Sequence, residues 1–257
     1  MTPPRAEWTL DTRRLGRRVL VYDELPSTND LAARLAHDPA NDGVAILADQ
    51  QSAGRGQHGR TWTAAPRSSV LLSLLLFPPD HLRRPAVLTA WAAVAVCQTV
   101  QRAIGVPARI KWPNDVLVRG KKVCGILIEQ GKGTVVGIGL NVAQTEADFL
   151  AADLPQATSL AQFTPSTLDS AAIARDLLRQ LDDEYALLLD GDLETLEACW
   201  KWHLGLLGRE VTAECHDGII QGRLRELTFA GVELERAGAA PITLLPEKVL
   251  HLTRQTG

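Results

Sequence analysis

The stretch Ala53-Gly54-Arg55-Gly56-Gln57-His58-Gly59-Arg60-Thr61-Trp62 decides between the fold classes open to this chain. Its three glycines let the backbone approach a ligand closely, and its two arginines offer permanently charged guanidinium groups to an anion. The glycines satisfy the pattern G-x-G-x-x-G, and residues 54–61 nearly satisfy the P-loop pattern, with Arg60 in place of the lysine. The composition is that of an anion-binding loop.

Both of those patterns need a helix directly after the loop, because the helix N-terminus holds the phosphates. Here the loop continues into Trp62-Thr63-Ala64-Ala65-Pro66 and then into the apolar run Val70 to Phe77, which predicts a strand. The sequence therefore disfavours a dinucleotide-binding or P-loop fold and indicates an anion loop between two strands. A flexible hairpin without a ligand would account for the glycines, but not for the two arginines and Trp62.

Polar residues precede the loop at the start of a predicted helix. Val44 to Ala48 is a predicted strand that leads to Gln51, and Ser27-Thr28-Asn29 stands before the apolar-periodic helix Leu31 to Leu35. Short polar side chains there are typical of an N-cap. One cap residue is enough, so the others are available to a ligand with a urea, amide or carboxylate group.

Beyond the loop, Pro85 to Ile104 predicts a core helix that ends at Gly105, since polar residues interrupt it too often for a membrane span. Three antiparallel strands should follow, over residues 108–118, 122–129 and 134–142. Five polar residues stand near the ends of these strands and are costly to bury without partners, which suggests a site: Lys111, Asn114, Asp115, Lys122 and Asn141.

Two helices and then a segment of different character are expected from residue 166 onward. Helical periodicity covers residues 166–189, with Ser166 or Thr167 as the cap, and a second helix covers Leu193 to His203, where Trp202 is expected to pack. Short strands separated by turns follow, which predicts a small β-barrel module. We place the domains at residues 1–207 and 208–257.

Composition limits the possible partners. The chain has 257 residues, 46% of them hydrophobic and 22% charged, as is usual for a globular protein with a sizeable core. A formal net charge of −3 disfavours nucleic acid and membrane surfaces as partners. The four cysteines form no C-x-x-C pair, so neither a disulfide scaffold nor a metal site is expected. Because residues 1–18 lack the apolar core of a signal peptide, we expect a cytoplasmic protein.

Taken together, the motifs resemble those of the biotin–protein ligases, over nearly the whole chain from about Tyr22 onward. The stretches that carry the resemblance, in the order of that family, are Ser27-Thr28-Asn29, Gly54-Arg55-Gly56, Lys111-Trp112-Pro113-Asn114-Asp115, Lys122-Val123-Cys124-Gly125-Ile126-Leu127-Ile128-Glu129 and Gly137-Ile138-Gly139-Leu140-Asn141. The resemblance implies an α+β fold like the class II aminoacyl-tRNA synthetases, a mixed sheet with helices, followed by a C-terminal SH3-like β-barrel.

The resemblance also implies a reaction. Biotin would be activated with Mg-ATP to biotinoyl-5′-AMP and then transferred to a lysine of the biotin carboxyl carrier protein of an acyl-CoA carboxylase. Lys122, Arg55 and Asp115 would be the catalytic residues, with Asp115 either a general base or an orienting group. By similarity, biotin would be bound by Ser27, Thr28, Asn29, Gln51, Gly54, Arg55, Gly56, Gln57, Lys122 and Gly125. ATP and the adenylate would be bound by Arg55, Arg60, Trp62, Lys111, Asn114, Asp115 and Asn141. The sequence has no metal-ligand spacing, so Mg²⁺ is expected to arrive with ATP.

Two departures and two alternatives accompany this interpretation. Gln57 stands where the family usually has arginine, which predicts a looser hold on the intermediate. About twenty residues precede the first core strand, too few for the DNA-binding domain of the repressor members, so the ligase-only form is expected. The alternatives are a lipoate or octanoate ligase or transferase of the same fold, and a non-catalytic biotin-binding regulator. The sequence leaves monomer and homodimer equally open.

Overall fold

Two β-sheets and five helices organise the computed structural model, which describes residues 3–236 and 238–255, apart from the His58 side chain. The larger sheet contains β1 (Ala6–Trp8), β2 (Val19–Leu25), β3 (Ala45–Gln51), β4 (Ser69–Leu76), β5 (Ala108–Lys111), β6 (Asp115–Val118), β7 (Lys121–Gln130) and β8 (Thr134–Asn141). The helices are α1 (Thr28–Leu35), α2 (Pro85–Ile104), α3 (Glu146–Ala151), α4 (Ser170–Leu189) and α5 (Leu193–Leu204). The smaller sheet contains β9 (Glu210–Cys215), β10 (Gly218–Leu227), β11 (Val232–Arg236), β12 (Ala239–Leu244) and β13 (Val249–Arg254).

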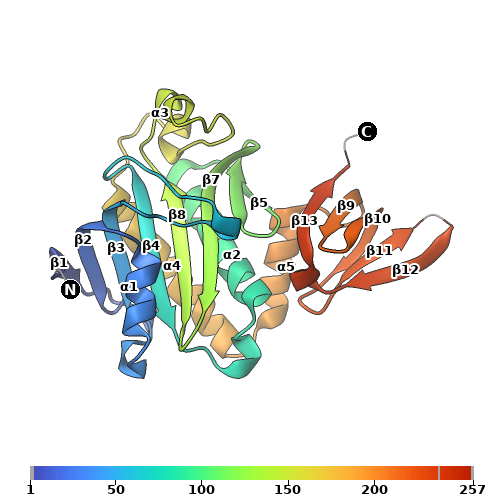
Figure 1. The fold of residues 1–257 in the computed structure, drawn as a ribbon, viewed down its shortest axis with the longest axis horizontal. Helices are drawn as coiled ribbons and strands as arrows, with labels where there is room; N and C mark the ends of the chain where they lie inside the picture. The colour runs from blue at the N-terminus through green and yellow to red at the C-terminus, as the bar shows by residue number, and fades with distance from the viewer. Residues whose placement is uncertain (1–2, 237, 256–257) are drawn as a thin grey trace.

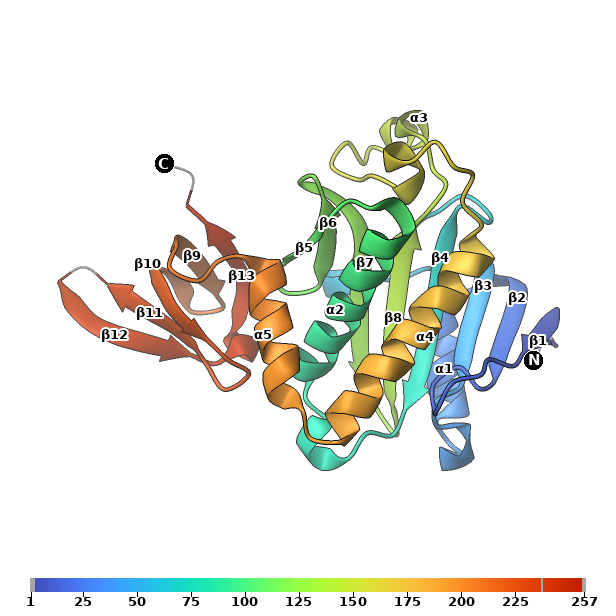
Figure 2. The same cartoon turned by 180° about the vertical axis from the view of Figure 1, so that it is seen from behind.

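The larger sheet is mixed, with the strand order β1-β2-β3-β4-β8-β7-β6-β5. Its strands pair antiparallel except for β2 and β3, which are parallel and are joined by the crossover through α1. Helix α1 covers one face of the sheet (Figure 1), and α2, α4 and α5 cover the other (Figure 2). This confirms the predicted α+β class. The glycine-rich loop lies between β3 and β4, as its sequence predicts.

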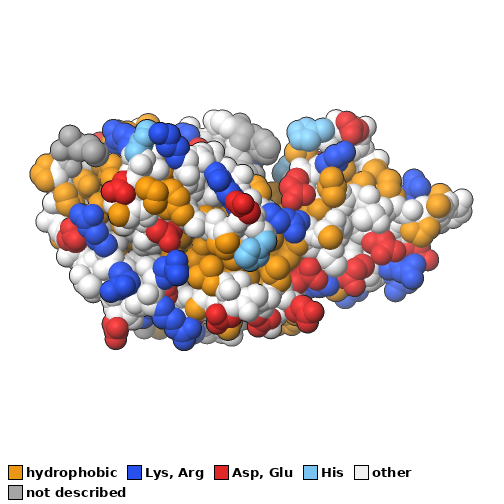
Figure 3. All heavy atoms as spheres, turned by 90° about the horizontal axis from the view of Figure 1, so that it is seen from below, with side chains coloured by type: hydrophobic (Ala, Val, Ile, Leu, Met, Phe, Trp, Pro, Cys, Tyr) orange, Lys and Arg blue, Asp and Glu red, His pale blue; other side chains and the backbone are white. Residues whose placement is uncertain are grey.

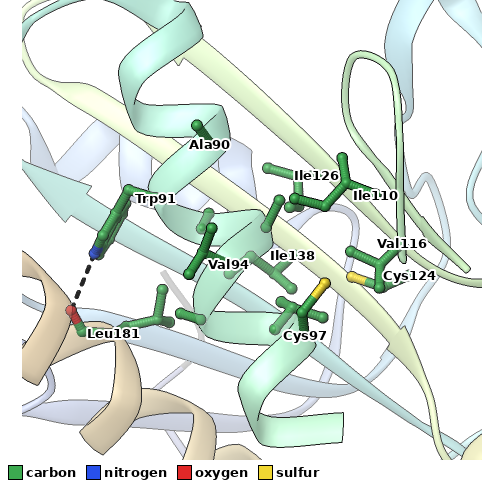
Figure 4. Packing of buried hydrophobic residues seen from close by; sticks show 14 of the residues in the cluster. Ala90, Trp91, Val94, Cys97, Ile110, Val116, Cys124, Ile126, Ile138 and Leu181 are labelled. Carbon is green, nitrogen blue, oxygen red and sulfur yellow. Dashed lines mark hydrogen bonds between the residues drawn. The ribbon is translucent and has the colours of Figure 1, made fainter. Parts of the chain in front are cut away.

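Helix α2 is the centre of the core. It packs on the sheet between α4 and α5, and its Trp91 is fully buried and donates its indole N–H to the Leu181 carbonyl at 3.2 Å (Figure 4). By length and composition α2 could cross a bilayer, but 67% of its apolar 18-residue window is buried inside the protein. A helix with neighbours on several sides needs a broad apolar surface, which accounts for the composition of α2. It ends as predicted, with Gly105 in the left-handed region at φ 68°.

The smaller sheet is antiparallel, in the order β12-β11-β10-β9-β13, and confirms a small C-terminal β domain. It packs beside β5 and α5, at the right of Figure 1. On the face seen from below, acidic and basic side chains are interspersed (Figure 3). The boundary at residue 208 stays a prediction; the described chain leaves α5 after Leu204 and enters β9 at Glu210.

Two local expectations were wrong. The strand expected over 108–118 is two strands, because a turn containing the cis Trp112–Pro113 bond separates β5 from β6. Helix α4 begins at Ser170, since the Asp169 carboxylate, rather than Ser166 or Thr167, accepts the Ala171 N–H as the cap. Trp202 is 58% exposed and packs as expected, with the Arg109 guanidinium 4.8 Å from the centroid of its ring.

Candidate active site

A cavity of about 520 Å³ opens over the larger sheet, and it gathers the motifs that lie far apart in the sequence. Its walls come from the start of α1, the glycine-rich loop, the turn between β5 and β6, strands β7 and β8, the segment that holds α3, and the smaller sheet. The sequence-derived candidates that line it are Ser27, Thr28, Asn29, Gln51, Arg55, Gly56, Gln57, Arg60, Trp62, Lys111, Asn114, Asp115, Lys122, Gly125 and Asn141. Gly54 does not line it. It lies behind the wall, where a Cβ would stand 2.3 Å from the Trp62 carbonyl oxygen.

The inner end of the cavity is built from neutral hydrogen bonds. Gln51 Oε1 accepts the Thr28 backbone N–H at 2.7 Å and the Thr28 hydroxyl at 3.1 Å, so Gln51 supplies the side-chain cap of α1. Ser27 makes no side-chain cap bond. Ser73 Oγ lies 2.7 Å from Thr28 Oγ1 and 2.5 Å from Asn29 Oδ1. Thr28, Asn29 and Ser73 are buried, so this end has a fixed shape.

Asn29 also connects the inner end to a charged group. Its Nδ2 donates to Glu129 Oε2 at 2.7 Å, across from α1 to β7. The Asn29 amide lies so close to β8 that a Cβ at Gly137 would stand 2.4 Å from it. A glycine is therefore required at 137 for this arrangement.

The Arg55 guanidinium is held by two carboxylates. Nη2 lies 2.6 Å from Asp30 Oδ1, and Nη1 lies 2.8 Å from Glu129 Oε1. These pairs anchor the glycine-rich loop to α1 and β7 at the opening of the cavity. An anionic ligand at Arg55 would share the guanidinium with these two carboxylates. The sequence analysis did not predict the pairing of Arg55 with Asp30 and Glu129.

Lys122 and Asp115 form the second charged pair, with Nζ 2.5 Å from Oδ1. The main chain of Lys122 is also fixed, since its N–H donates to the Gln156 carbonyl and its carbonyl accepts the Thr158 N–H, both at 2.8 Å. The lysine is thus held at its backbone and at its tip. A positioned cation of this kind stabilises charge that develops on a reacting anion.

Trp62 lies flat over a pair of glycines on neighbouring strands. Gly125 and Gly139 face each other in register, and a Cβ at Gly139 would stand 2.5 Å from the indole ring. The Lys122 ammonium is 5.8 Å from the centroid of the ring. The indole N–H is buried and has no partner among the residues that the structure describes, so it remains a donor for a ligand.

Asn114 and Asn141, two of the residues expected to bind the nucleotide, make hydrogen bonds within the protein in this structure. Asn114 Nδ2 donates to the Ile126 carbonyl at 2.7 Å, which fixes the turn before β6 against β7. Asn141 donates to the Thr158 carbonyl at 3.0 Å and accepts bonds from Ser69 and Gln144. Lys111 is exposed and free to meet an anion. The predicted contacts of these residues with a nucleotide stay predictions.

Two groups that line the cavity were missed by the sequence reasoning. Phe149, Leu154 and Ala157 come from the segment around α3, whose capping box of Thr145 and Asp148 was a readable signal. The second group comes from the smaller sheet and consists of Glu214, His251 and Thr253. These residues reach the cavity only because the two sheets pack together, so no local sequence pattern predicts them.

Among the described residues, the buried cysteines are unreactive and no group of three side chains is arranged to bind a metal ion. Burial raises the pKa of the thiol of Cys124, two residues after Lys122 on β7, and burial raises the pKa of Cys97 to about 12. Both thiols therefore stay protonated and unreactive near neutral pH. Across the described ranges, no three His, Cys, Asp or Glu side chains cluster in a way that could hold a metal ion.

Comparison with known proteins agrees with this geometry. Residues 21–143 match the model of the biotin/lipoate A/B protein ligase family. A biotin–[acetyl-CoA-carboxylase] ligase of Mycobacterium tuberculosis is 39% identical over 98% of this chain and 97% of its own length. The chain belongs to the biotin–protein ligase family. It is accordingly a ligase, as its motifs imply.

Other members of the biotin–protein ligase family extend the agreement. The bifunctional ligase/repressor BirA of Bacillus subtilis is 33% identical over 88% of this chain and 71% of its own length. The solved structure of the Aquifex aeolicus biotin protein ligase, in complex with biotin and ATP, has a TM-score of 0.76 and 26% identity and covers 92% of this chain and 99% of its own. The resemblance seen in the sequence is confirmed, and the cavity described above is the candidate site of a biotin–protein ligase.

Proposed function

We propose that this protein activates biotin with Mg-ATP to biotinoyl-5′-AMP and transfers the biotinoyl group to a lysine of a biotin carboxyl carrier protein. The observation that carries the proposal is the Lys122–Asp115 pair, at 2.5 Å, in one cavity with the polar end formed by Thr28, Asn29 and Gln51. The nearly full-length likeness to a named biotin–[acetyl-CoA-carboxylase] ligase supports the same reaction.

In the first step, a carboxylate oxygen of biotin attacks the α-phosphorus of ATP, and the bond to the β-phosphate oxygen breaks to release pyrophosphate. Two anions approach each other in this step, so positive charge has to stand between them. Lys122 offers that charge from β7, and Arg55 and Arg60 offer it from the glycine-rich loop. The indole of Trp62 covers the floor and would exclude water from the mixed anhydride.

In the second step, the amine nitrogen of the carrier lysine attacks the biotinoyl carbonyl carbon, the bond to the phosphate oxygen breaks, and AMP leaves. The attacking amine has to lose a proton. Asp115 is the carboxylate beside Lys122 and faces the cavity, so it either accepts that proton or orients the amine.

Mg²⁺ fits this site only as a companion of ATP. The described side chains offer no cluster of three metal ligands, and Asp115 is already bound by Lys122. Mg²⁺ would therefore be held chiefly by the triphosphate, would keep most of its water, and would neutralise phosphate charge. The remaining roles in both steps belong to side chains of the protein.

The inner end of the cavity favours biotin over lipoate or octanoate. It presents amide and hydroxyl groups from Thr28, Asn29 and Gln51, and Ser73 holds Thr28 and Asn29 by hydrogen bonds from outside the lining. The ureido ring of biotin has N–H donors and a carbonyl acceptor for such groups. A fatty acyl chain or a dithiolane has neither, and would be placed against a polar lining with which it cannot hydrogen-bond.

The deciding experiment is exchange of labelled pyrophosphate into ATP, with Mg²⁺ and biotin, lipoate or octanoate in separate reactions. We expect exchange with biotin alone, followed by transfer to an added biotin carboxyl carrier protein. Exchange with lipoate or octanoate would move the substrate to the sister branch of the family. Absence of exchange with every acid, in protein with a normal melting curve, would leave a non-catalytic biotin-binding regulator.

A further inference from the structure

One buried side chain joins the turn between β5 and β6 to the C-terminal sheet. The Trp112 indole N–H donates to the Val249 carbonyl at 2.8 Å, and Val249 is the first residue of β13. Trp112 is only 4% exposed and also lines the cavity. In both Figure 1 and Figure 2, β13 lies beside β5, so this bond crosses between the two sheets.

The bond is supported by an aromatic stack. The Trp112 ring centroid is 5.5 Å from that of Trp200 on α5, and Trp200 stacks on Phe229 at 5.0 Å with an interplanar angle of 17°. Phe229 belongs to the smaller sheet's turn between β10 and β11. The stack fixes the plane of the Trp112 indole, and with it the direction of its N–H.

Other contacts hold the C-terminal sheet independently of this bond. Glu197 on α5 accepts the Phe229 N–H at 2.9 Å, and Lys201 on α5 lies 2.8 Å from Glu226. These contacts reach β10 and its turn. The bond from Trp112 reaches β13 instead, the strand that borders the cavity.

β13 carries two of the three C-terminal residues that line the cavity. His251 and Thr253 line the cavity from β13, and His251 stands in register with Glu214 of β9. The register shifts between Val249 and His251, so the buried Val249 does not alternate regularly with the two cavity residues. Val249 stands only two residues before His251, so fixing its backbone sets where the rest of β13 begins. The neighbours of Trp112 in sequence, Lys111 and Asn114, line the same cavity.

We propose that Trp112 is a positioning residue that fixes the C-terminal sheet as a wall of the active site. Its bond to Val249 sets the place of β13, and thereby the imidazole of His251, the hydroxyl of Thr253 and the carboxylate of Glu214 at the end of the cavity where Lys111 lies. The inference rests on the proposed function and on the expectation from the sequence that Lys111 and Asn114 bind the nucleotide. Trp112 acts through this wall rather than on the reacting atoms.

The test is Trp112→Phe, which keeps a large aromatic ring and removes the N–H donor. In biotin-dependent pyrophosphate exchange, the KM for ATP should rise about fivefold, the size of one ordinary hydrogen bond, while kcat changes less. Amide hydrogen exchange over residues 249–254 should become faster, because β13 loses its tie to the catalytic sheet. The second readout needs no activity.

The matched control is Trp91→Phe. Trp91 is also buried and also donates its indole N–H to a backbone carbonyl, that of Leu181 at 3.2 Å, but it lies in the core away from the cavity. We expect it to lower the melting temperature while leaving the KM for ATP and the exchange of β13 unchanged. An equal rise in KM in both variants, or an unchanged KM in Trp112→Phe, would overturn the proposal.

If Trp112→Phe does not fold, a double variant tests the same proposal. The double variant Glu214→Gln, His251→Ala changes the wall itself and should raise the KM for ATP in the same direction; an unchanged KM would overturn the role of the wall. If the wild-type protein gives no exchange with any acid, the proposed function fails. The hydrogen exchange of β13 in Trp112→Phe against Trp91→Phe still decides whether Trp112 positions the strand.

Discussion

The inner end of the cavity and its opening are built on different physical principles. At the inner end, Thr28, Asn29 and Ser73 are 3%, 5% and 0% exposed and satisfy one another with neutral hydrogen bonds. At the opening, Lys122 and Arg55 are paired with carboxylates, and their side chains are 34% and 44% exposed. A buried neutral network defines a shape, whereas a half-exposed ion pair can exchange one anion for another. We therefore expect the inner end to select the ligand and the opening to stabilise the charge of the reacting anions.

We expect the largest loss of activity from a substitution at the opening of the cavity. Lys122→Ala removes the cation beside the reacting carboxylate and phosphate, and we expect pyrophosphate exchange to fall by about a thousandfold, the loss typical of a deleted transition-state donor. Pyrophosphate exchange at saturating biotin and ATP measures it. Lys121→Ala is the matched control, because Lys121 is the neighbouring lysine and pairs on the surface with Glu146 at 3.4 Å. Comparable losses in both variants would contradict the role given to Lys122.

A smaller effect should come from the inner end. Ser73→Ala removes the hydroxyl that joins Thr28 to Asn29, leaving buried polar groups unsatisfied, and should raise the KM for biotin about tenfold. Ser69→Ala is the control on the same strand, since Ser69 bonds to Gln144 and Asn141 instead. It should leave the KM for biotin unchanged. If the two serine variants behave alike toward biotin, the inner end does not select the ligand.

The smallest effect tests the loop that lies over both regions. Gln57 lines the cavity but carries no charge. Gln57→Arg adds a guanidinium near the phosphate of biotinoyl-5′-AMP, and release of the intermediate should slow about threefold, as expected for one partly exposed ion pair. Rapid filtration of the protein loaded with labelled biotin gives the release rate. An unchanged rate would mean that the glutamine already holds the intermediate as well as arginine does.

Local patterns were enough to predict the strands on both sides of the glycine-rich loop, helix α2 with its end at Gly105, and the small C-terminal β domain. The turn at Trp112–Pro113 was missed although proline inside a strand is itself a warning, since it cannot donate to a neighbouring strand. The pairing of Arg55 with Glu129 spans 74 positions of sequence and depends on strand order and register, which no local pattern contains. For the same reason the wall that β13 contributes could be found only in the folded protein.

The parallel pairing of β2 with β3 has a consequence for how the site tolerates change. Leu25 is in register with Gln51, so Ser27–Asn29 and the glycine-rich loop leave the sheet side by side at the C-terminal end of these two strands. Slipping β2 by a single residue would shift its end by about 3.3 Å relative to β3 and turn its side chains to the opposite face. A deletion inside β2 or β3 would therefore separate Thr28 from Gln51 even though every motif residue remained in the sequence. The tolerance of the site to insertion and deletion is set by strand length, and not only by the residues that face the ligand.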